Sequence, residues 1–281
     1  MSVVSILGAG DIGAATAYAL ARRSRVGDVR LVDSAANVAA GKALDMRQAG
    51  PIEHFDTPVS ARGDVLDAVN ADVIVIADPV TDGEWEGERG LAMVKQLMRA
   101  GTKAPLVFAG PKQAWLMEAA VREAGVPANR IVGSASAAVH SGVRALAALE
   151  LNGSGVDVSI ALVGRAPGFT IGWTSATFAG SVLTEQIPPH RMLAISDMLK
   201  KMWPPKPQAI GAATALIVEG LLAGSRRHLY ATTVLEGEFG ARGVATMVPV
   251  ELGDRKIIRR IEPSLSSQEK VEFLNGLSRK S

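Results

Sequence analysis

Short apolar runs separated by alanine-rich, amphipathic stretches dominate the first half of the chain. The runs are VVSIL (3–7), VRLVD (29–33), DVIVIA (72–77), APLVFA (104–109) and RIVG (130–133). Runs of this kind, bounded by helical stretches, are typical of strands in a parallel sheet that is covered on both faces. The pattern predicts an α/β domain with right-handed crossovers.

The second half has a mixed pattern, which predicts an α+β domain. Expected helices cover about 137–151, 190–203 and 209–223, expected strands cover 156–164, 229–237, 244–252 and 255–261, and an amphipathic helix begins at Ser266 or Ser267. Because no repeat or flexible linker is visible, we expect the boundary near Gly133, between a domain of residues 1–133 and a domain of residues 134–281.

Composition narrows the functional classes. The 281 residues carry a net charge of +2 and no cysteine, so disulfides and thiolate chemistry are excluded. Basic residues are scattered without interleaved aromatics, which argues against nucleic-acid binding. We expect no metal site, because the chain has no cysteine and only four histidines. We also expect no membrane segment and a cytoplasmic location, because the N-terminus enters a strand directly and no uncharged run reaches about 18 residues.

Three glycines, Gly8, Gly10 and Gly13, lie between the first strand and the first helix, with Asp11 and Ile12 among them. This is the setting of a dinucleotide fingerprint, in which the backbone approaches a pyrophosphate and the helix amides bind it. Asp33 follows at the end of the second apolar run, where a carboxylate accepts hydrogen bonds from ribose hydroxyls and repels a 2′-phosphate. The combination predicts NAD as cofactor; the alternative is a glycine turn kept only for packing.

Several further motifs, taken in order, resemble those of the lactate and malate dehydrogenases. They are LGAGDIG (7–13), LVD (31–33), GKALDM (41–46), RIVG (130–133), IVEGLL (217–222), LEGEFG (235–240), MVPVELG (247–253) and LSSQEK (265–270). The resemblance covers nearly the whole chain. It implies a Rossmann-type NAD-binding domain followed by an α+β substrate domain, and assembly into a homodimer or homotetramer.

The resemblance also implies an active site whose reacting groups are replaced here. The family uses a histidine as acid/base, an aspartate that orients it and an arginine that binds the substrate carboxylate. Ala166 takes the histidine position in VGRAPGFT (163–170), whereas Val139 and Gly142 take the aspartate and arginine positions in AVHSGVR (138–144). Gly110 replaces an asparagine of the family.

The family's mobile loop is shortened and acidic here. Its counterpart, DPVTDGEWEGERG (78–90), has five acidic residues and only Arg89 as a base, so it would repel a carboxylate substrate. Asp78 and Pro79 stand where the family has small residues beside the cofactor, which is a reason to expect weaker NAD binding.

His140, Arg144 and Arg165 are the candidates for a relocated active site. His140 and Arg144 are four residues apart on an expected helix, and Arg165 is next to Ala166. Each also has an ordinary structural interpretation, as a hydrogen-bonded histidine or an ion-paired arginine. His54, His190 and His228 have no metal-ligand spacing.

Three functions therefore remain open at this point. The first is an NAD-binding member of the family with weak or absent 2-hydroxyacid dehydrogenase activity. The second is a dehydrogenase for a less anionic hydroxy or keto compound that uses a relocated acid/base. The third is a non-enzymatic oligomeric scaffold or NAD(H) sensor.

Overall fold

The structure is a computed structural model that describes residues 2–225 and 228–278. The N-terminal strands are β1 (Val3–Leu7), β2 (Asp28–Val32), β3 (Val59–Arg62), β4 (Val73–Ile76), β5 (Leu106–Phe108) and β6 (Ile131–Gly133). They are parallel and run side by side in the order β3-β2-β1-β4-β5-β6. The expected parallel sheet is therefore confirmed.

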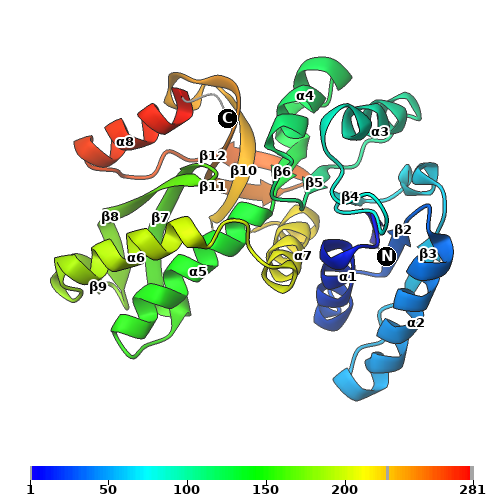
Figure 1. Cartoon of the computed structure of the whole chain (residues 1–281), viewed down its shortest axis with the longest axis horizontal. Helices are drawn as coiled ribbons and strands as arrows, with labels where there is room; N and C mark the ends of the chain where they lie inside the picture. Colours follow the sequence, from blue (N-terminus) through cyan, green and yellow to red (C-terminus); the bar gives the residue numbers. More distant parts are fainter. Residues whose placement is uncertain (1, 226–227, 279–281) are drawn as a thin grey trace.

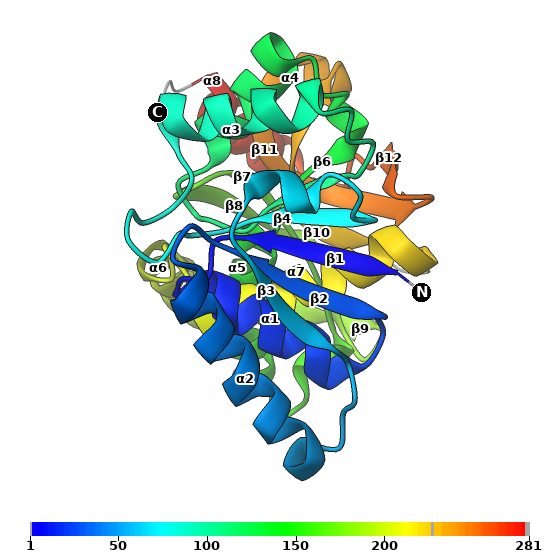
Figure 2. The same ribbon diagram turned by 90° about the vertical axis from the view of Figure 1, so that its right-hand side faces the viewer.

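Helices cover both faces of this parallel sheet (Figure 2). One face packs against α1 (Asp11–Arg23) and α2 (Ala36–Glu53), and the other packs against α3 (Gly87–Arg99) and α4 (Ala114–Ala124). Alternate strand residues point to opposite faces. Ile6 therefore lies in the first core, between the sheet and α1 and α2, and Leu7 lies in the second core, between the sheet and α3 and α4. This burial on both faces explains why the strands are apolar without alternation.

The C-terminal half adds antiparallel strands and four helices (Figure 1). The strands are β7 (Val158–Arg165), β8 (Gly168–Phe178), β9 (Ser181–Val182), β10 (Leu229–Glu236), β11 (Arg242–Gly253) and β12 (Lys256–Arg260). The helices are α5 (Ala135–Glu150), α6 (Pro189–Lys201), α7 (Pro207–Ala223) and α8 (Ser267–Ser278). A third core lies between α5, α6 and the β7–β8 hairpin.

Both halves share one twelve-stranded sheet. The strand pairing between the halves is narrow, because β6 meets β10 at the single pair Gly133 and Thr232. A domain boundary at Gly133 remains a proposal, and α7 crosses it by packing against α1 of the first half.

The segment 163–170 belongs to two strands, although the sequence pattern predicted only one, at 156–164. Arg165 ends β7 and Gly168 begins β8, so GFTIGWTSATF forms a long strand where none was expected. Its pairing partner, β7, supplies the apolar surface that a mixed sequence of this kind needs to form a strand.

Among the described helices, none is long and apolar enough to cross a membrane.

Candidate functional site

The glycine turn joins β1 to α1 with little space for side chains. The Gly8 N–H donates to the Val32 carbonyl at 2.8 Å, and Gly8 has a φ of +112°, which favours glycine. A Cβ on Gly13 would collide with the Gly8 carbonyl oxygen. The turn is therefore the close strand–helix packing that the sequence predicted. Asp11 and Ile12 begin α1, where Asp11 is exposed and Ile12 is buried.

The side chain of Asp78 lies on the N-terminus of α1. Its carboxylate accepts hydrogen bonds from the backbone N–H groups of Ile12 at 3.1 Å and Gly13 at 2.8 Å. The Asp78 carbonyl accepts a third hydrogen bond, from the Gly10 N–H at 2.7 Å. Burial raises the pKa of the Asp78 carboxyl, and the amides oppose part of that rise. The amides that a fingerprint of this kind offers to phosphate thus bind an internal anion.

The carboxylate of Asp33 also has backbone partners. It lies at the end of β2, is 3% exposed, and accepts hydrogen bonds from the N–H groups of Ala9, Ala35 and Val80 at 2.8, 2.9 and 3.0 Å. Asp33 therefore ties the glycine turn to the segment after β4. Nearby, Lys42 donates to the Ala9 carbonyl at 2.7 Å and adds a positive charge beside the turn.

The acidic segment 78–86 is held by the side chains of two residues, one from α3 and one at the start of α4. Gln113, which is fully buried, donates to the carbonyls of Ala77 and Trp85. Arg89 donates to the carbonyls of Asp82 and Glu84, forms an ion pair with the Asp82 carboxylate and lies 4.8 Å from the centre of the Trp85 ring. These contacts hold the segment over the carboxyl ends of β1 and β4.

Glu84 fills the space above Gly110. Its carboxylate accepts a hydrogen bond from the Lys112 N–H at 2.9 Å, and a Cβ on Gly110 would collide with it. Burial raises the pKa of Glu84, and Asp78 adds to that rise as a neighbouring negative charge. The side chain at the asparagine position implied by the resemblance is thus replaced by a carboxylate from the loop.

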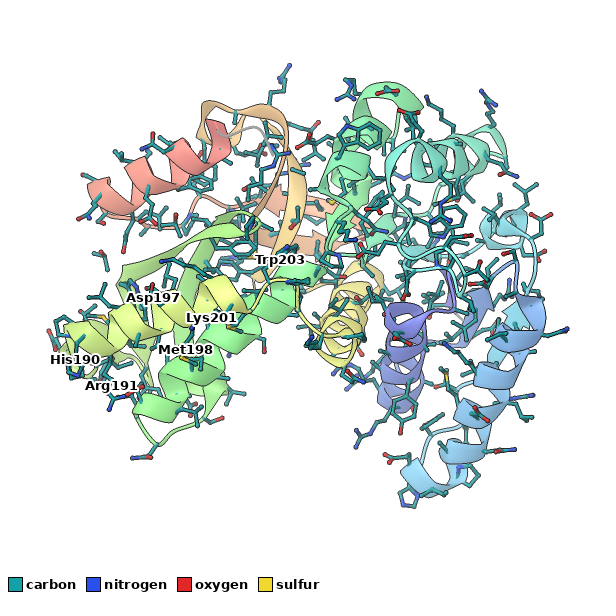
Figure 3. All side chains as sticks on the ribbon, viewed as in Figure 1. His190, Arg191, Asp197, Met198, Lys201 and Trp203 are labelled. Atoms are coloured by element: carbon teal, nitrogen blue, oxygen red, sulfur yellow. The ribbon has the colours of Figure 1, made fainter. Side chains whose placement is uncertain are left out.

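The three positions that the resemblance matches to the family's histidine, aspartate and arginine have apolar neighbours. Val139 is fully buried in the third core, and a Cβ on Gly142 would collide with the methyl group of Met202. Ala166 lines a cavity of about 30 Å³ together with Gly110, Trp203 and Thr246. Trp203 lies just beyond the end of α6 (Figure 3) and packs edge-on against Phe169. A cavity of this size holds about two water molecules.

His140 has a structural environment in α5. Its Nε2 is 3.0 Å from the Ile160 carbonyl oxygen, and because a carbonyl only accepts, Nε2 carries the proton and donates. The ring stacks on Tyr230 with centroids 4.0 Å apart. Burial lowers the pKa of His140 to about 4, so the ring is neutral at pH 7.

Arg144 and Arg165 are likewise engaged. Arg144 donates to the Val158 carbonyl at 3.0 Å, and Arg165 forms an ion pair with Glu118 at 3.0 Å. Glu118 also accepts a hydrogen bond from the Ala245 N–H, so the pair links β7, α4 and β11. Each of the three sequence candidates therefore has protein partners.

A larger cavity of about 660 Å³ adjoins α5 and α7. His140, Arg144, Tyr230, Met202 and Lys206 line part of it. The structure thus brings His140 and Arg144 together at one cavity, as their spacing predicted, and places Arg165 at the separate cavity beside Ala166.

Comparison with known proteins finds similarity to lactate and malate dehydrogenases along nearly the whole chain. Residues 2–96 match the NAD-binding domain of lactate/malate dehydrogenase. The chain is 30% identical to a malate dehydrogenase of Geobacillus thermodenitrificans and 31% identical to that of Anoxybacillus flavithermus, in each case over 98% of this chain and 94% of the relative. The chain belongs to the lactate/malate dehydrogenase family.

Solved structures confirm the fold of this lactate/malate dehydrogenase family member. A malate dehydrogenase from Salinibacter ruber superposes with a TM-score of 0.87 at 26% identity, over 98% of this chain and 93% of that one. A minor L-lactate dehydrogenase from Enterococcus mundtii also gives 0.87, at 22% identity over 99% of this chain and 95% of that one. The family, the oxidoreductase class and NAD as cofactor are confirmed.

The sequence does not identify several residues that contact the glycine turn, the acidic segment or the candidate site residues. Asp78 was noted only as an obstacle beside the cofactor, and Gln113, Glu118, Met202 and Trp203 were assigned no role at the site. No local pattern distinguishes them, because their partners are distant in sequence. Among the described residues, no group of three or more His, Asp or Glu side chains is placed to hold a metal ion.

Proposed function

We propose that this chain is an NAD-binding member of the lactate/malate dehydrogenase family whose ordinary 2-hydroxyacid dehydrogenase activity is weak or absent. The observation that carries the proposal is the cavity of about 30 Å³ beside Ala166. Sites for small molecules usually enclose about 300–1,000 Å³, so a substrate and a nicotinamide ring have no space there.

The residue types at the three positions matched by the resemblance support the same proposal. Ala166, Val139 and Gly142 have no group that transfers a proton or binds a carboxylate, although acid–base catalysis needs a group that titrates near neutrality. Loss of the acid/base alone costs about 10²- to 10⁴-fold in rate. The loss of a carboxylate-binding arginine lowers the rate further, because the substrate is positioned less well. The two reductions in rate do not simply multiply, because the two groups act together.

The deciding measurement is NADH oxidation with saturating pyruvate or oxaloacetate at neutral pH. The Salinibacter ruber malate dehydrogenase, assayed in parallel, verifies the reagents. We expect no turnover in the common enzyme range of about 1–10³ per second. Turnover in that range by the purified chain would refute the proposal.

A second candidate is a dehydrogenase that acts on a less anionic hydroxy or keto compound. The cavity of about 660 Å³ favours it, because this cavity has the volume of a small-molecule site and includes His140 and Arg144. Against it, a ring with a pKa of about 4 is a weak base at neutral pH. A screen of neutral ketones with NADH distinguishes this candidate from a sensor or scaffold, which would bind NADH without turnover.

We also propose that the chain forms a closed homodimer or homotetramer. Val38, Leu44 and Ile52 on α2 and Leu216 on α7 are exposed apolar side chains that a second subunit would cover. Sedimentation equilibrium at micromolar concentration tests this. A monomer under those conditions would contradict it.

A further inference from the structure

The cradle for a dinucleotide phosphate is occupied by a group of matching chemistry. A phosphate at a helix N-terminus is an anion that accepts hydrogen bonds from the amides of the first turn. The Asp78 carboxylate is such an anion, and it binds the N–H groups of Ile12 and Gly13. A pyrophosphate and this carboxylate therefore compete for the same two donors.

The open side of the glycines is filled as well. Glycines in a fingerprint leave room for the backbone to approach the pyrophosphate. Here a Cβ on Gly8 would collide with the Asp78 backbone, and a Cβ on Gly10 would collide with the Asp78 carboxylate. The Asp78 carboxylate thus takes the volume beside Gly10, and a dinucleotide phosphate does not fit there in this conformation.

The segment that carries Asp78 is anchored on both sides. Before it, the Ala77 N–H donates to the Leu7 carbonyl at 3.0 Å, and after it the Val80 N–H donates to the Asp33 carboxylate. Farther along, the Trp85 N–H returns to the Ala77 carbonyl at 3.2 Å. Because the backbone around Asp78 is fixed in this way, its side chain is held in position over the amides.

We propose that Asp78 is a built-in competitor of NAD, an internal anion that closes the phosphate cradle and must leave it before the cofactor binds. The apparent affinity of a ligand falls by the fraction of molecules in the binding-competent state, so Asp78 sets the dissociation constant for NAD without being part of any reaction. This inference concerns cofactor binding alone, and it holds whether or not the chain turns over a substrate.

The test is a calorimetric titration of the full chain with NADH. Asp78→Ala removes the carboxylate and leaves the backbone contacts in place, so its dissociation constant falls about 10- to 100-fold relative to the unchanged chain. Glu86→Ala is the matched control, because it removes the same charge from the same segment, and the exposed Glu86 side chain makes no capping hydrogen bond at α3. Its dissociation constant stays within about threefold.

A second measurement separates the cradle from the rest of the cofactor site. Inorganic pyrophosphate raises the melting temperature of Asp78→Ala, because it replaces the missing anion, and has no effect on the unchanged chain. If Asp78→Ala does not fold, Asp78→Asn takes its place; it retains one acceptor oxygen and tightens NADH binding by a smaller factor, about three- to tenfold.

Unchanged or weaker NADH binding by a folded Asp78 variant would overturn the inference. Equal tightening by Glu86→Ala would overturn it too, because general repulsion by the acidic segment would then explain the effect. Absence of NADH binding by every variant would show that Asp78 is not what closes the site.

Discussion

The cofactor cradle and the region around Ala166 are both filled in this protein, but in different ways. In the cradle the hydrogen-bond donors remain, and a carboxylate from the chain binds them. Around Ala166 the proposal is that the reacting groups have been replaced, and the side chain of Trp203 lines the small cavity that remains. We therefore expect one substitution, at Asp78, to free the backbone amides of α1. Replacing the side chains proposed to be missing near Ala166 would need several substitutions together.

The strongest test of the cradle side of this comparison is the substitution Gly13→Ala. Its Cβ would collide with the Gly8 carbonyl, so either the helix or the strand must move, and we expect a loss of roughly 3 kcal/mol or more in the free energy of unfolding. Urea denaturation measures it.

Gly41→Ala is the control for that substitution. Gly41 lies in α2 with no atom within 4 Å of the added Cβ, so the change stabilises the chain by about 0.5–1 kcal/mol. Similar free energies of unfolding for the two variants would show that the turn tolerates a side chain and that the packing argument is wrong.

His140, which lies at the larger cavity, should make the free energy of unfolding depend on pH. The pKa of His140 is about 4 in the folded chain and near 6.5 when unfolded, so the unfolded chain binds more protons between these values. Stability due to the neutral ring is therefore fully present above pH 6.5 and is lost as the pH falls towards 4. The loss is roughly 2–3 kcal/mol.

His140→Gln supplies the reference for this titration, because it removes the ionisable group. Its free energy of unfolding, measured by urea denaturation at pH 4.5 and 7.5, should change less with pH than that of the unchanged chain. Parallel curves for the two proteins would mean that His140 is not held neutral by burial.

The smallest expected effect comes from Ala166→His. We expect less than a tenfold gain in NADH oxidation with oxaloacetate, because Val139 cannot orient the new imidazole and Gly142 cannot bind the acid. Space is also lacking in a cavity of about 30 Å³. A gain of about 10²-fold or more would show that the region is disabled at one position only.

Much of the fold was predictable from local pattern. The strands at 3–7, 106–108 and 131–133 lie within the expected apolar runs, and α7 at Pro207–Ala223 closely matches the expected 209–223. The strand β8 was missed, because Gly168–Phe178 mixes polar and apolar residues and forms a strand only through its pairing with β7. The proposed replacement of the catalytic groups rests on the sequence, through the resemblance.

What the sequence by itself determined is the glycine turn, the parallel α/β order and the alanine at position 166 on which the proposed loss of the acid/base rests, since these depend on residue type and on spacing within one element. Only the tertiary structure decided what fills the vacated places. Asp78 reaches the amide of Gly13 from 65 positions away, and Tyr230 in β10 stacks on His140 in α5. Such contacts arise when distant strands and helices pack together, and no local periodicity encodes which side chain arrives at an unfilled donor or an unfilled volume.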